Sequence, residues 1–173
     1  MVIRMRAAHF WRLGQAAVIL VAVWAILLSA QAAHAAQPVR FQPSPMVINN
    51  DRGGLINDRL QQMRTLLKRG QRVEIRGDFC FSTCTMLLGM PNVCILPGTA
   101  FGFHGPSRFG RPLEEDVFRR ASLVIAGFYP EGLRDWYLNT ARFQIDGVMQ
   151  RSGAELIRMG IRSCDPRAIS LVQ

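Results

Sequence analysis

The chain has 173 residues and a formal net charge of +9, and 49% of its residues are hydrophobic. A chain of this length accommodates one domain of ordinary size. Beyond position 35 the basic residues are scattered, with no run longer than two, and all except Lys68 are arginine. A nucleic-acid-binding protein would show a clustered basic stripe with interleaved aromatic residues, so we expect no nucleic-acid partner.

Residues 1–35 have the order of a secretory signal peptide. Three arginines and no acidic residue precede an apolar run over 16–28, and Ala33-His34-Ala35 forms a small-x-small cleavage site. The run is shorter than the about 20 residues that a membrane-spanning helix requires. We therefore expect cleavage near Ala35 or Ala36 and an exported protein, periplasmic or secreted. An uncleaved signal that anchors the domain at a membrane is the alternative. After cleavage 18 basic and 12 acidic residues remain, a net charge of +6.

All four cysteines follow this leader, at Cys80, Cys84, Cys94 and Cys164. An exported compartment permits disulfides, and an even number suits two bridges. The alternative is that some are buried as small apolar residues. Their spacing lacks a zinc-ligand pattern such as Cys-x₂-Cys, so we expect no metal site.

The elements expected first are a strand, a helix and a second strand. A proline-rich lead-in over 36–45 precedes the domain, which we place at 46–173. A short strand at 46–48 leads through a glycine turn into a helix whose apolar positions recur from Ile56 to Leu67. Gly70 ends that helix, and a strand follows at 73–75. Together these elements predict a right-handed βαβ unit.

The pattern then repeats over the second half. A short apolar helix is expected to run from Ser82 to Leu88, followed by strands at 93–96 and 101–103. Helical spacing continues over 112–128 and again over 133–137, which predicts an arm packed beside the sheet. A helix at 154–159 and a closing strand at 161–164 complete an α/β domain.

Ser82 and His104 are the candidate catalytic pair. His9 and His34 leave with the leader, so His104 is the only imidazole of the mature chain. Ser82 lies where a strand ends and a helix starts, where free N–H groups and positive potential would surround its hydroxyl. Each feature has a structural alternative: a packed histidine, a serine N-cap, and a plain turn at Gly53-Gly54.

Three blocks, taken in order, resemble the Clp protease proteolytic subunit. They are Ile48-Asn49-Asn50-Asp51-Arg52-Gly53-Gly54, then Cys80-Phe81-Ser82-Thr83-Cys84-Thr85-Met86-Leu87-Leu88, then Pro97 followed by Phe103-His104-Gly105-Pro106. The segment Cys-x-Ser-x-Cys-Thr followed by Gly-x-His is more similar still to a group of uncharacterised exported Clp-like proteins. The resemblance implies an α/β fold of the Clp and crotonase kind, in which strand–strand–helix or βαβ units repeat as a spiral sheet with flanking helices.

The resemblance also implies roles for individual residues. Ser82 would be the nucleophile and His104 the base, and the amides of Gly54 and Thr83 would form the oxyanion hole. The aspartate of the family's triad falls on Val148 here, and Asp146 is the nearest substitute. In the family's fold the strands that carry Cys94 and Cys164 lie side by side, so a bridge between them is expected.

Cys80 and Cys84 flank Ser82 in the sequence. They can pair only if the first helical turn bends toward the end of the preceding strand, because a disulfide requires Cα atoms about 4.4–6.8 Å apart.

The expected function is that of an exported Clp-like serine hydrolase, a peptidase that needs no cofactor. Its partner would be a peptide or protein substrate; a homo-oligomer is allowed, and no ATPase partner is expected where ATP is absent. One alternative is a catalytically inactive exported scaffold or binding domain of the same fold, which the missing aspartate favours. Another is a crotonase-like acyl-thioester enzyme, whose nucleotide-linked substrate is not expected outside the cytoplasm.

Overall fold

The structure is a computed structural model, and it describes residues 43–165. The expected signal peptide, most of the lead-in and residues 166–173 lie outside the described range. Within that range no helix combines the length and the apolar character needed to cross a membrane.

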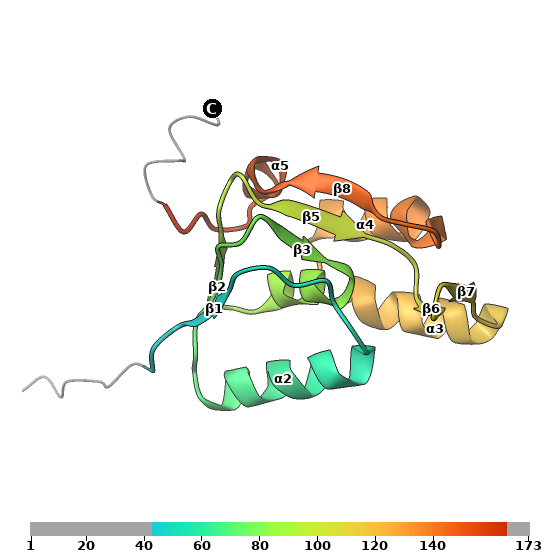
Figure 1. Cartoon of the computed structure of the whole chain (residues 1–173), viewed down its shortest axis with the longest axis horizontal. Coiled ribbons are helices and arrows are strands. Elements are labelled where there is room, and N and C mark those ends of the chain that lie inside the picture. The colour runs from blue at the N-terminus through green and yellow to red at the C-terminus, as the bar shows by residue number, and fades with distance from the viewer. Residues whose placement is uncertain (1–42, 166–173) are drawn as a thin grey trace, which may run out of the picture. The chain divides into compact units, whose positions relative to one another are not determined.

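Two three-stranded sheets form the centre of the fold (Figure 1). In the first, the strand order is β1-β2-β4 and all neighbours are parallel. Its strands are β1 (Met46–Ile48), β2 (Val73–Ile75) and β4 (Val93–Ile95). In the second, β5 pairs in parallel with β3 and antiparallel with β8. Its strands are β3 (Phe79–Phe81), β5 (Ala100–Phe103) and β8 (Met149–Ser152).

Three stretches of chain pass from the first sheet to the second and then enter a helix. After β1, Asp51 pairs with Cys80 of β3, and α2 (Ile56–Lys68) follows. β2 continues into β3 and a 3₁₀ helix, η1 (Ser82–Gly89). β4 continues into β5 and, after a hairpin, into α3 (Glu115–Ala126). The expected mixed α/β class is therefore present, and each passage delivers a loop to the same ends of the strands.

Helix α2 follows the periodicity of its sequence. It buries Met63 and Leu66 in the hydrophobic core, where it packs on η1, and it also buries the charged residue Arg59. Gly70, at φ +59°, ends the helix in the left-handed conformation that glycine adopts at little cost. The amides of Gly70 and Gln71 donate to the carbonyls of Leu67 and Leu66, which satisfies the last turn.

Helix η1 runs through the middle of the core and is buried from Thr83 to Leu88. Its neighbours include β3, β4, β5 and α2. From α4 (Glu131–Asn139), the side chains of Leu133 and Tyr137 reach the same core and are fully buried. An eight-residue helix with no polar face is stable only in such an environment, because its stability comes from packing.

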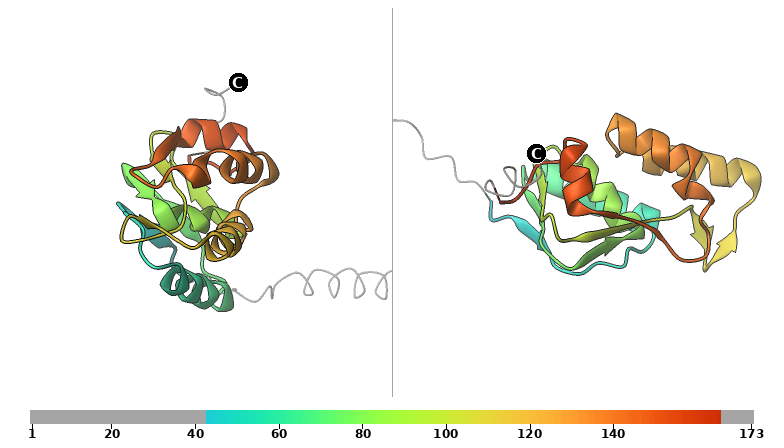
Figure 2. Two further views of the ribbon diagram at one scale, coloured as in Figure 1. Left: turned by 90° about the vertical axis from the view of Figure 1, so that its right-hand side faces the viewer. Right: turned by 90° about the horizontal axis from the view of Figure 1, so that it is seen from above.

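The segment before α3 differs from the expected continuous helix over 112–128. A hairpin of β6 (Ser107–Arg108) and β7 (Arg111–Pro112) occupies this position, and α3 begins only at Glu115. The two residues at the tip, Phe109 and Gly110, both have positive φ, which reverses the chain. Figure 2 shows the hairpin beside α3, away from the strands.

The expected closing strand at 161–164 is reduced to a single bridge between Ser163 and Ile95. The amide of Ile95 donates to the carbonyl of Arg162, and the amide of Cys164 donates to the carbonyl of Ile95. The Arg162 guanidinium donates to the carbonyl of Val93, 3.0 Å away. The segment therefore lies beside β4 as predicted, but a side chain supplies part of the pairing that a strand would supply.

The last helix, α5 (Gly153–Arg158), begins with a capping box. The amide of Glu155 donates to the Ser152 hydroxyl, and the Glu155 carboxylate accepts from the Ser152 amide at 2.7 Å. The Glu155 carboxylate also accepts from the Ser152 hydroxyl at 2.8 Å. Its hydrogen bonds from the Ser152 amide and then from this hydroxyl hold the pKa of Glu155 below its ordinary value. A carboxyl group with a lowered pKa stabilises the fold above its unfolded-state pKa, and this contribution is lost as the pH falls through the folded-state pKa.

Ser152→Ala is therefore expected to lower the free energy of unfolding by about 1 kcal/mol at neutral pH. The difference from wild type should shrink as Glu155 becomes protonated. Urea unfolding at several pH values and an NMR titration of the Glu155 carboxyl group would measure both effects. Thr65→Ala is the control, because that hydroxyl bonds only to the carbonyl of Gln61 within α2. An unchanged Glu155 pKa in Ser152→Ala would contradict the prediction.

Candidate active site

A cavity of about 850 Å³ opens where the three passages leave the strands. Its wall combines the turn after β1, the start of η1, the segment after β5 and one face of α3. Among its lining residues are Gly54, Ser82, Thr83 and His104, four of the five residues expected to form the site. Segments separated by about fifty positions in the sequence thus converge on one space.

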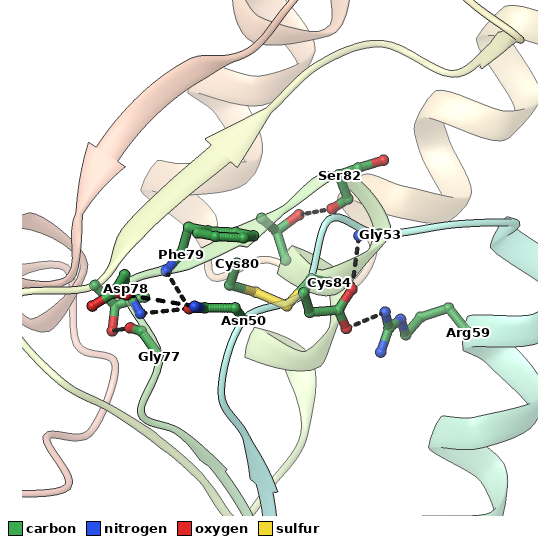
Figure 3. Close-up of a disulfide and its surroundings, with 12 residues drawn as sticks. Asn50, Gly53, Arg59, Gly77, Asp78, Phe79, Cys80, Ser82 and Cys84 are labelled. Atoms are coloured by element: carbon green, nitrogen blue, oxygen red, sulfur yellow. Dashed lines mark hydrogen bonds and ion pairs between the residues drawn. A yellow bond between two sulfur atoms is a disulfide. The ribbon is translucent and has the colours of Figure 1, made fainter.

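Ser82 is the first residue of η1 and has φ +56°. This left-handed conformation costs a non-glycine residue roughly 1–2 kcal/mol, and such outliers gather at functional sites. The N-cap position is taken by Phe81, and no side chain caps the helix. Ser82 is therefore not the N-cap that the sequence allowed, because its own backbone already belongs to the first turn. Its hydroxyl points away from the neighbouring disulfide in Figure 3.

The candidate oxyanion amides belong to Gly54 and Thr83. Thr83 is the second residue of η1, so its N–H has no carbonyl partner inside the helix. The Thr83 hydroxyl donates to the carbonyl of Gly54 at 3.4 Å, which ties the glycine turn to the start of η1. Gly53, one position earlier, has its α-carbon turned so closely to Ser82 that a Cβ added to it would lie 2.4 Å from the Ser82 Cβ.

His104 follows directly after β5 and is half-buried. Its Nδ1 lies 2.8 Å from the carbonyl oxygen of Gly105. A carbonyl can only accept a hydrogen bond, so in this geometry Nδ1 carries the hydrogen and Nε2 keeps its lone pair. Gly105 itself is fixed: its amide donates to Gln144, and a Cβ there would lie 1.9 Å from the carbonyl oxygen of Arg142.

A buried tyrosine holds the backbone of His104. The Tyr137 hydroxyl donates to the carbonyl of His104 at 3.3 Å. Burial raises the pKa of Tyr137 above its ordinary value, so the hydroxyl keeps its proton and remains a donor.

A second buried hydroxyl pair supports Ser82. Thr85 Oγ1 donates to the carbonyl of Ser82 at 2.7 Å and lies 2.6 Å from the hydroxyl of Tyr129. Burial likewise raises the pKa of Tyr129. The backbone on both sides of the proposed reaction centre is thus fixed by buried tyrosines.

Asp146 does not join the other candidates. It is exposed, lies in the turn after η2 (Ala141–Phe143), and is not among the residues that line the cavity. Its carbonyl accepts from the Gln144 side chain, and Gly147 turns the chain away at φ +82°. Val148, where the triad aspartate was expected, approaches Gly102 of β5. Among the cavity-lining residues none is acidic, and within residues 43–165 no hydrogen bond joins Ser82 to His104.

Both expected disulfides are present. Cys80 and Cys84 pair across Ser82 with their Cα atoms 5.3 Å apart, and Cys94 pairs with Cys164 at 4.8 Å. Both separations are those of ordinary bridges. Disulfides persist in oxidising compartments, so the domain belongs to a non-cytoplasmic, oxidising location. Within residues 43–165, no group of three or more histidine, cysteine, aspartate or glutamate side chains is placed to hold a metal ion.

Asp51 and Arg59 form an ion pair beside the glycine turn that the sequence interpretation missed. Their signal was present, because Arg59 falls within the apolar stripe of α2 between Ile56 and Met63. A charged residue at such a position must find a partner.

No protein-family model and no curated protein matches this chain.

Proposed function

We propose that this protein is an exported serine hydrolase of the Clp type, periplasmic or secreted, which cleaves peptide or protein substrates. The observation that carries the proposal is the convergence of Gly54, Ser82, Thr83 and His104 on one cavity. Further support comes from the left-handed backbone of Ser82, a conformation that a purely structural serine does not need.

The arrangement suits acyl transfer. Ser82 Oγ attacks the scissile carbonyl carbon while its proton passes to Nε2 of His104. The carbonyl oxygen gains negative charge, and the amides of Gly54 and Thr83 donate hydrogen bonds to it. The C–N bond then breaks, and the amine leaves with the proton from His104. Water, deprotonated by the same imidazole, releases the acyl group from Ser82.

The carbonyl of Gly105 takes the place of the missing carboxylate. A triad aspartate orients the imidazole and stabilises its charged form. The Gly105 carbonyl accepts from Nδ1 and performs the first task, but as a neutral dipole it performs the second less well. We therefore assign the chain a Ser82–His104 dyad, slower than a complete triad and without a role for Asp146.

The fold expected from the Clp resemblance is consistent with the repeated strand–strand–helix passages. Each passage crosses two sheets before its helix, as in a spiral of such units. ATP is not expected outside the cytoplasm, so the exported enzyme would act without an ATPase partner.

The second candidate function is an inactive exported scaffold or binding domain of the same fold. The exposed position of Asp146, away from the cavity, favours it. The two candidates differ in the reactivity of Ser82, which a binding domain does not require.

Reaction with a fluorophosphonate probe separates them. Wild type is expected to form a covalent adduct that mass mapping places on Ser82. Ser82→Ala should abolish the adduct, and His104→Ala should slow its formation by about 100-fold or more, as expected for loss of a general base. Ser163→Ala is the control, because that hydroxyl bonds to the carbonyl of Asp165 and does not line the cavity. A folded wild type that stays unlabelled would favour the scaffold.

A further inference from the structure

A buried ion pair lies just outside the cavity, beneath the turn that carries Gly53 and Gly54. The Arg59 side chain on α2 is only 8% exposed, and that of Asp51 is 20% exposed. Nη2 of Arg59 lies 2.5 Å from Oδ2 of Asp51, and Nη1 donates to Gln62 at 2.6 Å. Burying a charge is costly unless it is paired and hydrogen-bonded, so both groups are held in fixed positions.

Asp51 joins three parts of the site. Its second carboxylate oxygen, Oδ1, accepts from the amide of Gly53 at 2.7 Å. Its carbonyl accepts from the amide of Phe81 at 2.8 Å, one residue before Ser82. The Gly53 amide and the Arg59 guanidinium thus bond to different oxygens of this carboxylate, and Figure 3 marks the bonds from both labelled residues. Helix α2, the glycine turn and the end of β3 are therefore linked through one residue.

The glycine turn lies against the nucleophile without a gap. A Cβ on Gly53 would lie 2.9 Å from the Ser82 Oγ and 2.9 Å from the carbonyl oxygen of Phe81. Gly54, whose amide is the proposed oxyanion donor, is the next residue. A shift of the turn by a fraction of an ångström therefore changes the distance from that donor to the oxygen of the carbonyl group that Ser82 attacks.

Another buried carboxylate shows what a purely structural pair looks like in this fold. The Glu74 side chain on β2 is 11% exposed, against 20% for that of Asp51, and it pairs with Arg72 at 2.8 Å and Arg76 at 2.7 Å. Both partners are two positions away on the same segment. None of the three lines the cavity. Glu74 thus shares the burial and the arginine pairing of Asp51 but not its connection to the glycine turn.

We propose that Asp51 and Arg59 are positioning residues, which hold the Gly53–Gly54 turn so that the Gly54 amide faces the oxyanion formed at Ser82. The inference rests on the proposed hydrolase function and adds to it two residues that do not touch the substrate. Asp51 sets the turn through the Gly53 amide, and Arg59 fixes the direction of the Asp51 carboxylate.

The test measures the second-order rate constant for fluorophosphonate labelling in the full-length chain, at a temperature where every variant is folded. Asp51→Ala is expected to lower it by about 10- to 100-fold, because small misplacements of an oxyanion donor have effects of that order. Asp51→Asn should recover part of the loss, since its amide oxygen still accepts from Gly53. Glu74→Gln is the control, with a rate within about twofold of wild type.

Amide hydrogen exchange supplies a readout that does not depend on the reaction. The Gly53 amide should exchange faster in Asp51→Ala than in wild type, while the amides of β2 keep their protection. Equal shifts of the unfolding midpoint in Asp51→Asn and Glu74→Gln, together with unequal labelling rates, would separate positioning from stability. If Asp51→Ala does not fold, Arg59→Lys decides the question, with an expected loss of several-fold.

The outcomes distinguish this inference from the function on which it rests. A folded wild type that is not labelled would overturn both. Only the positioning role would be overturned if wild type is labelled and the three variants Asp51→Asn, Asp51→Ala and Arg59→Lys are labelled at the wild-type rate. The role would also fail if Glu74→Gln slowed labelling as much as the Asp51 variants, because the effect would then follow from any lost buried ion pair.

Discussion

Replacing Gly53 with alanine is expected to lower the rate of Ser82 labelling by at least about 100-fold. The new Cβ would lie 2.4 Å from the Ser82 Cβ and 2.9 Å from its Oγ, a contact that neither backbone can avoid without moving. Gly53 also has φ +91°, where a side chain is strained whatever the space. The turn would shift away from Ser82 and take the Gly54 amide with it, which removes an oxyanion donor worth about 10²–10³ in rate.

Gly70→Ala is the matched control for this variant. Gly70 also has a left-handed backbone, at φ +59°, but a Cβ there would meet no atom within 4 Å, and it does not line the cavity. Both variants should lose about 1–2 kcal/mol of stability from backbone strain. Only Gly53→Ala should be labelled more slowly than its unfolded fraction alone explains. Urea unfolding would measure that fraction, and probe kinetics would measure the labelling rate. Labelling of folded Gly53→Ala at the wild-type rate would contradict the proposed site.

The elements that the sequence predicted well are those whose periodicity is carried by their own residues. Helix α2 and strands β1, β2 and β4 bury apolar side chains at the expected positions. Strand β8 was missed because Met-Gln-Arg-Ser has no alternating apolar pattern. Its pairing depends on the folded chain, in which β8 hydrogen-bonds to the edge of β5 that β3 does not occupy.

Four of the five residues expected at the site line one cavity and Asp146 does not, and the geometry among them was not predicted. Gly54, Ser82 and His104 line one cavity, and each follows a strand, a placement that the sequence pattern indicated. The positive φ of Ser82 was not predictable, because it depends on how β3 enters η1 under the constraint of the Cys80–Cys84 bridge. The hydrogen bond from His104 to Gly105 was equally hidden, since a backbone acceptor leaves no mark in the sequence.

Removing the Cys94–Cys164 bridge is expected to cause the largest loss of stability of any change considered. The bridge joins β4 to residues 70 positions further on. In the chain-entropy description, closing a loop of that length restricts the unfolded chain by about 4 kcal/mol. The bridge between Cys80 and Cys84 closes a loop of only four positions and contributes about 2 kcal/mol by the same relation. Paired Cys→Ser variants and urea unfolding would measure both losses.

The order should be reversed for the labelling rate of Ser82: removal of the Cys80–Cys84 bridge should lower this rate more than removal of the Cys94–Cys164 bridge. Cys94 and Cys164 do not line the cavity, so the folded fraction of their double variant should react with the probe at the wild-type rate. The Cys80–Cys84 bridge spans Ser82 and Thr83, so its removal frees the peptide that carries the nucleophile and one oxyanion amide. We expect labelling of that variant to fall about tenfold while it remains folded, an effect of misplacement. A double variant of Cys80 and Cys84 that is less stable than its counterpart yet labels normally would reverse both assignments, because the short bridge would then support the fold and not the site.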